Sequence, residues 1–145
     1  MKKTIYLIRG EKAESYNDFK NRILLLVHNL VEKHESVLAK VVLTELTPPT
    51  ISIIPFKKDK IAAISVAVEI KPSLNIIEEE HGFAGAFEVT EALPVAYDKN
   101  WPDGKVTPGV CLLTLFNQKK AIDYKTFINR WHHSHTPLSL KIHPL

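Results

Sequence analysis

Cysteine is nearly absent from the sequence: Cys111 is the only one, so no disulfide can form within the chain. It lies in the apolar run "GVCLLTLF", where we expect a buried, inert thiol in a reducing compartment. No stretch approaches the roughly 20 apolar residues of a membrane span. The N-terminal "MKKTIYLIRGEK" is too short in apolar residues for a secretory signal. These absences predict a cytoplasmic protein with no membrane partner.

Glycine is also scarce, with 5 in the chain, and no glycine-rich phosphate-binding loop occurs. No serine stands in a nucleophile-elbow pattern. The 19 basic and 16 acidic residues leave a net charge of +3, and the lysines are scattered rather than gathered in one tract. A nucleic-acid interface needs a continuous basic stripe with stacking aromatics, so we expect no nucleic-acid partner.

The chain does have the length and apolar content of a folded domain, with 145 residues of which 45% are hydrophobic. Its hydrophobic periodicity predicts strands at 4–8, 37–46, 61–70 and 83–97, and helices at 15–34 and 73–80. The 61–70 segment is apolar on both faces and is therefore expected in the middle of a sheet. This β-α-β-β-α-β order predicts an α+β fold with a ferredoxin-like unit.

An internal repeat follows this unit. Residues 112–131, "LLTLFNQKKAIDYKTFINRW", align without a gap on residues 4–23, "TIYLIRGEKAESYNDFKNRI". The aligned pairs include Tyr16 with Tyr124 and Phe19 with Phe127. We therefore divide the chain into a ferredoxin-like repeat at 1–98, a linker loop at 99–109, and a partial second repeat, one strand and one helix, at 110–145.

The second repeat lacks most of its sheet. A ferredoxin-like sheet covers one face with its helices and leaves the other apolar, so that face needs a partner. Two such units packed sheet to sheet form a barrel with a cavity between sheets and helices. We expect a homodimer of the dimeric α+β barrel type, or a chain shortened relative to its natural form.

The helix of the second repeat carries the candidate site. Asp123 is expected to cap it, and its apolar face is formed by Tyr124, Phe127, Ile128 and Trp131 and extended by His135. His132 lies at the edge of this stripe, whereas His133 points away from it. Pro137 disfavours helical geometry before it, which predicts that the helix ends near His135. Extending the alignment places Trp131, His132 and His135 where the first copy has Ile23, Leu24 and Val27. This divergence selects the second copy as the candidate site.

Other roles are open for these histidines. His135 in a last helical turn could act as a general acid or base, cap the helix, or pack. His132 and His135 could share a metal ion, given a further ligand such as His143. The run "EEEH" at 78–81 could add carboxylates, although such a run is usually a solvated face.

Residues 87–145 resemble the EthD-domain family. The "W-H-x-x-H-x-P-L" ending of that family is matched by Trp131, His132, His135, Pro137 and Leu138. The resemblance implies a dimeric α+β barrel that holds a small apolar ligand. Family members are associated with ether degradation, and relatives of similar fold include cofactor-free cyclases, dehydratases and monooxygenases.

Our leading hypothesis is an enzyme or binding protein, without cofactor or metal, for a small apolar oxygenated or aromatic molecule. It assigns His135 and His132 as catalytic residues and Trp131, Phe127 and Tyr124 as the substrate contacts. The alternatives are a non-catalytic ligand-binding or assembly module, or a histidine metal site.

Overall fold

A computed structural model describes residues 2–46, 60–68, 75–93, 95, 98–109, 111, 113–115 and 117–142. The chain divides into two compact units, Met1–Glu91 and Ala92–Leu145. Residues 51–59, Tyr97 and His143 lie outside the described residues.

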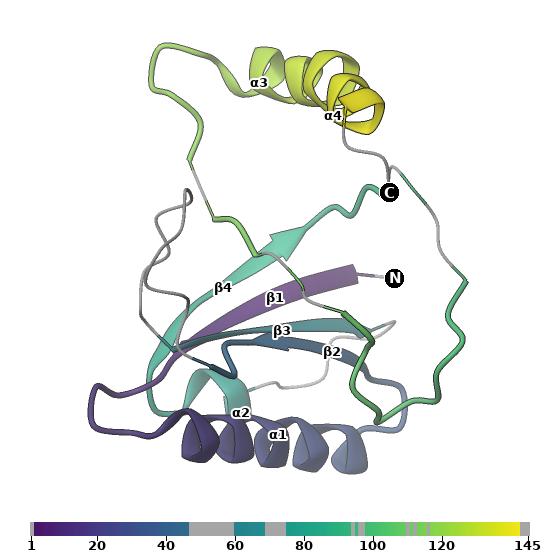
Figure 1. Cartoon of the computed structure of the whole chain (residues 1–145). Coiled ribbons are helices and arrows are strands. Elements are labelled where there is room, and N and C mark those ends of the chain that lie inside the picture. Colours follow the sequence, from purple (N-terminus) through teal and green to yellow (C-terminus); the bar gives the residue numbers. More distant parts are fainter. Residues whose placement is uncertain are drawn as a thin grey trace. The chain divides into compact units, whose positions relative to one another are not determined.

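The first unit is an α+β structure with a four-stranded antiparallel sheet in the order β2-β3-β1-β4 (Figure 1). Its elements in chain order are β1 (Lys2–Arg9), α1 (Tyr16–Lys33), β2 (Leu38–Leu43), β3 (Ile61–Val68), α2 (Asn75–Glu78) and β4 (Phe83–Val89). The α+β class is therefore confirmed, and so is the interior position of the 61–70 strand, since β3 pairs with both β2 and β1. The last strand is shorter than predicted, because the described residues after Val89 are irregular.

Helix α1 forms where the periodicity predicts it. The Ser15 side chain caps it by accepting the Asp18 N–H at 3.1 Å, which satisfies one of the donors that a helix start leaves unpaired. The residues of α1 that are buried follow one another at intervals of four, three and four: Phe19, Ile23, Leu26 and Leu30. One stripe of the helix thus faces the sheet.

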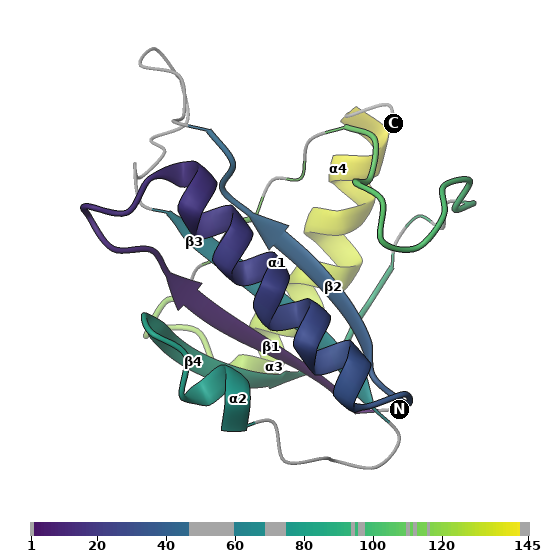
Figure 2. The same cartoon turned by 90° about the horizontal axis from the view of Figure 1, so that it is seen from below.

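The core lies between this stripe and one face of the sheet, with α1 and α2 on the same side (Figures 1 and 2). Tyr6 of β1 lies opposite Ile64 of β3, and both are buried against the helices. Ile77 supplies the contribution of α2 and is fully buried. Full burial of each such aliphatic side chain contributes about 1.5–3 kcal/mol to folding.

The opposite face of the sheet is also apolar but carries exposed side chains. Residues paired across antiparallel strands share a face, so Ile5 lies beside Phe87 and Ala67 beside Leu38. Phe87 is 52% exposed and Leu38 is 64% exposed. This face also carries Lys40 and Ser65, but its exposed side chains include these large apolar groups, whereas a solvated sheet face is usually polar.

The connection from α2 into β4 requires Gly82. Its φ of 81° is in the left-handed region, and a Cβ there would overlap the carbonyl oxygen of Arg9. The Arg9 N–H donates to the Gly82 carbonyl oxygen at 2.8 Å. Only glycine fits this close crossing of two backbones without strain.

The described part of the second unit is irregular up to Asp123 and then helical to Ile142. The helical segment consists of α3 (Tyr124–Arg130), a π turn (Trp131–His135) and α4 (Thr136–Ile142). Residues 113–115, inside the strand expected at the start of this repeat, are irregular, while Leu112 and Phe116 lie outside the described residues. The expectation of a buried thiol is wrong, because Cys111 is exposed. None of the described helices is both long and apolar enough to cross a lipid bilayer.

Candidate functional site

The helix that carries the candidate residues starts as a close copy of α1. The Asp123 side chain accepts the Thr126 N–H at 2.9 Å, as Ser15 does for Asp18 in the first unit. The two capping residues have φ and ψ of −69° and 157° for Asp123 and −70° and 159° for Ser15. The predicted cap is confirmed, and the repeat extends to the backbone geometry of the helix start.

Three of the predicted site residues form a column of rings along this helix. The ring centroids of Phe127 and Trp131 are 6.0 Å apart with the planes tilted by 37°, and those of Trp131 and His135 are 4.7 Å apart at 39°. Both distances are in the range in which aromatic rings attract one another. The imidazole of His135 therefore lies against the indole of Trp131.

The closer approach of the second pair follows from the π turn. The Thr136 N–H donates to the carbonyl oxygen of Trp131, five residues before it, instead of four. An α-helix has 3.6 residues per turn, so the residue at i+4 overshoots residue i. In the wider π turn residue i+4 lies more nearly above residue i, which brings His135 over Trp131. Such turns are rare and frequently mark functional sites.

Pro137 does not end the helix, and that prediction is wrong. Proline lacks an N–H and its ring collides with the carbonyl four residues earlier, here that of His133. The π turn immediately before Pro137 changes which carbonyls are used, and Pro137 becomes the second residue of α4, near a helix start, where proline is tolerated. The backbone thus relieves the conflict by widening one turn, and the helix continues to Ile142.

The ring column is accessible. Within the column, Trp131 is 36% exposed, His135 is exposed and Phe127 is partly buried. Tyr124, the first residue of the predicted stripe, is 70% exposed. The predicted burial of this stripe, with His135 as its extension, is therefore wrong for the unit as described. The same face of the first-copy helix holds the fully buried Phe19 and Ile23.

Tyr124 and His132 contribute to a different surface. A hollow of about 820 Å³ follows the helix and contains both of them, but neither Trp131 nor His135. Its lining residues are Tyr124, Lys125, Thr126, Ile128, Asn129, Arg130, His132 and His133. One helix supplies all of these residues, so the hollow is open to solvent on its outer side. The structure thus divides the five predicted site residues between two adjacent faces of one helix.

No group of three histidine, cysteine or acidic side chains in the described part of the chain could hold a metal ion. His132 and His135 would need a third ligand, and His143, the candidate from the sequence, is outside that part.

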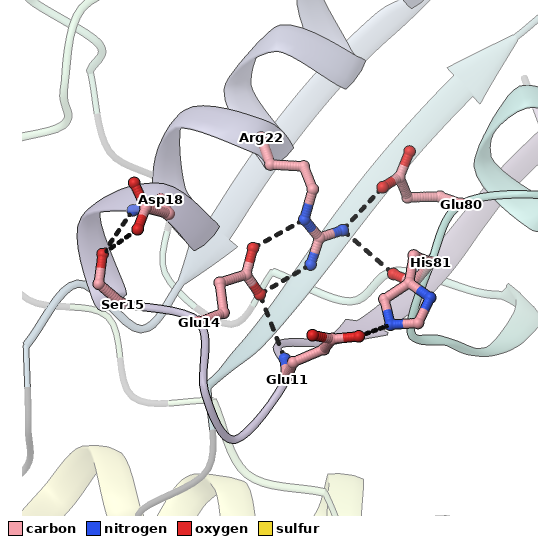
Figure 3. Close-up of polar contacts among 7 residues, drawn as sticks. All are labelled: Glu11, Glu14, Ser15, Asp18, Arg22, Glu80 and His81. Atoms are coloured by element: carbon pink, nitrogen blue, oxygen red, sulfur yellow. Dashed lines mark hydrogen bonds and ion pairs between the residues drawn. The ribbon is translucent and has the colours of Figure 1, made fainter.

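A second polar cluster, in the first unit, was missed by the sequence analysis (Figure 3). The Arg22 guanidinium on α1 donates to both carboxylate oxygens of Glu14, at 2.8 and 3.0 Å. It also donates to Glu80 at 2.7 Å and to the backbone carbonyl of His81 at 3.1 Å. The His81 ring in turn pairs with Glu11. Arg22 thus ties the loop before α1 to the turn between α2 and β4.

The charges of this cluster stabilise one another. Hydrogen bonding to Arg22 lowers the pKa of Glu14, with a smaller contribution from nearby Lys60, and the pKa of Arg22 is raised mainly by Glu14. Glu80 belongs to the "EEEH" run, which is typical of a solvated face. Its side chain, however, is only 21% exposed and is paired with Arg22. The signal available in the sequence was Arg22 itself, which recurs in the repeat as Arg130.

Comparison with known proteins gives no relative: no protein-family model, no curated protein and no solved structure matches the chain. The resemblance to the EthD-domain family therefore depends on the residues 87–145 that carry it.

Proposed function

We propose that the protein binds a small apolar, oxygenated or aromatic molecule on the ring column of the second unit. Trp131 provides the stacking surface, Phe127 extends it, and His135 exchanges a proton with the bound molecule, with His132 assisting. The observation that carries the proposal is the contact of the His135 and Trp131 rings at 4.7 Å on an accessible helix face. A ring held by Trp131 would lie within reach of the imidazole.

The chemistry requires no cofactor. Histidine changes charge near neutral pH and is the side chain used most often for general acid and base catalysis. Packing against the indole restricts the imidazole, and such positioning contributes to catalysis. The reaction class that fits is a proton-transfer reaction such as cyclisation or dehydration, or a cofactor-free oxygenation, as the resemblance to the EthD-domain family implies.

The proposal includes a finer description of the fold. The strand order β2-β3-β1-β4, with both helices on one face, supports a ferredoxin-like unit of the dimeric α+β barrel type. The exposed Phe87 and Leu38 on the other face support a homodimer, because monomeric proteins rarely leave large contiguous apolar patches in water.

The test uses Trp131 as its own reporter. In a Trp101→Phe background, indole emission comes from Trp131 alone, so a fragment set of small aromatic alcohols, ethers and ketones can be screened for changes in that emission. His135→Gln should abolish turnover, or weaken binding, of the fragments that respond. The matched control is His28→Gln, an exposed histidine on α1 outside the candidate site, which should leave them unchanged.

Two outcomes would contradict this proposal. One is that no fragment alters Trp131 emission. The other is that His135→Gln and His28→Gln behave alike in every assay.

A second candidate function, a module that assembles through its sheet, is favoured by the same exposed apolar face. Leu38→Glu should convert a dimer to a monomer in light scattering. Leu25→Glu changes a side chain of α1 that is 60% exposed, and it should not affect the dimer. A wild-type protein that stays monomeric at high concentration would contradict both the homodimer and the assembly module.

A further inference from the structure

The internal repeat retains an arginine but not its partner. Arg22 and Arg130 occupy equivalent positions in the repeat. In the first copy, Arg22 donates two parallel hydrogen bonds to the Glu14 carboxylate. The residue equivalent to Glu14 is Ile122. Arg130 is exposed, and no side chain among the described residues forms an ion pair with it. Its guanidinium keeps the donors that Arg22 uses for a carboxylate.

The surroundings of Arg130 are positive. The hollow that Arg130 lines also contains Lys125, and none of the described residues that line it is acidic. The whole helical segment 124–142 has no aspartate or glutamate. A surface lined by charges of one sign concentrates ions of the opposite sign, so this hollow favours an anion.

Arg130 also borders the ring column. It follows Phe127 by three residues, and residues three apart are neighbours on a helix surface. A molecule whose ring lies on Phe127 and Trp131 can therefore extend an acidic group toward Arg130. Arginine suits this role because its planar donors match a carboxylate in two parallel hydrogen bonds, as Arg22 demonstrates in the first unit.

We infer that the ligand of this helix is an aromatic or apolar carboxylate and that Arg130 binds its carboxylate. This inference rests on the proposed function, since Trp131 and Phe127 hold the apolar part. It adds the charged group of the ligand and the residue that selects for it. Lys125 strengthens the positive field, and Ile128 provides apolar contact within the same hollow.

The experiment compares a charged and a neutral probe of the same ring and similar size, 2-naphthoate and 2-naphthamide, by isothermal titration calorimetry on the full chain. We expect the wild-type protein to bind naphthoate about tenfold more tightly, as a charge-assisted hydrogen bond in a partly solvated site would give. Arg130→Gln should remove this preference by weakening naphthoate binding. Lys141→Gln removes the same charge from the same helix outside the hollow and should keep the preference.

Three results would overturn the inference. If both probes bind equally and Trp131→Ala abolishes their binding, the proposed function stands and only the inference of a carboxylate ligand fails. Absence of naphthoate binding at millimolar concentration would exclude the carboxylate ligand. Binding of vesicles containing phosphatidylserine, without binding of naphthoate, would instead identify the basic helix as one that attaches to an anionic lipid surface.

Discussion

Removing Arg22 tests how much the charged cluster of the first unit contributes to stability. Arg22→Met keeps an unbranched apolar stem and deletes four hydrogen bonds: two to Glu14, one to Glu80 and one to the His81 carbonyl. The Arg22 and Glu14 side chains are 26% and 13% exposed, so the bonds are better shielded from water than those of a surface pair. Because the freed carboxylates can still reach solvent, we expect the free energy of unfolding to fall by about 2 kcal/mol, between an exposed and a buried network.

The matched control lies on the same helix. Lys20 pairs with Glu45, and these side chains are 34% and 48% exposed. Lys20→Met should therefore cost less than about 1 kcal/mol. Urea unfolding followed by far-ultraviolet circular dichroism measures both variants. Equal losses for the two, or a loss below about 0.5 kcal/mol for Arg22→Met, would refute the reasoning from shielding.

The same cluster predicts a pH dependence. Arg22 lowers the pKa of Glu14 in the folded state, so the Glu14 carboxylate binds a proton more readily in the unfolded chain. The stabilisation by this pair is therefore complete above the ordinary glutamate pKa of about 4.3. It is lost as the pH falls through the lower, folded-state pKa. Arg22→Met should flatten this acid limb of the stability curve. An unchanged slope below pH 4.3 would show that other carboxylates cause it.

Three further predictions concern the backbone. Gly82→Ala should destabilise the first unit by about 2–4 kcal/mol in urea unfolding, because it combines a left-handed φ with overlap on Arg9, and a loss under 1 kcal/mol would contradict the close crossing. Ser15→Ala should cost about 1 kcal/mol in the same assay through loss of the helix cap, and no loss would contradict the capping role. Pro137→Ala should let the π turn revert to α-helix and move the His135 ring away from Trp131. NMR would then show a smaller upfield ring-current shift of the imidazole protons, and an unchanged shift would show that proline does not maintain the turn.

Local signals in the sequence predicted the first unit well. Ser15 and the apolar spacing from Phe19 to Leu30 specify α1, and the doubly apolar 61–70 segment specifies a central strand. These features depend on a cap or a period within one element, which adjacent residues determine. The α+β class followed from the order of elements.

Features that depend on distant residues or on competing local rules were not predictable in this way. Glu80 looked solvated because its partner Arg22 is 58 residues away along the chain. Pro137 was expected to stop the helix because the steric rule for proline assumes α-helical bonding, and a π turn satisfies the same constraint differently. Within the candidate site, the cap and the ring column followed from the sequence, whereas the division between the column and the hollow depended on that turn.

The π turn also changes how the two halves of the chain correspond. A widened turn accommodates one more residue than the regular helix that it interrupts, so the two helices can be aligned with one additional residue in the second copy after Trp131. The constant offset between the copies is then valid only as far as Trp131. Beyond it, allowing one extra residue places His135 opposite Leu26, a core residue of α1, instead of Val27. In this alignment, a position that contributes to the core in the first copy holds an exposed imidazole in the second.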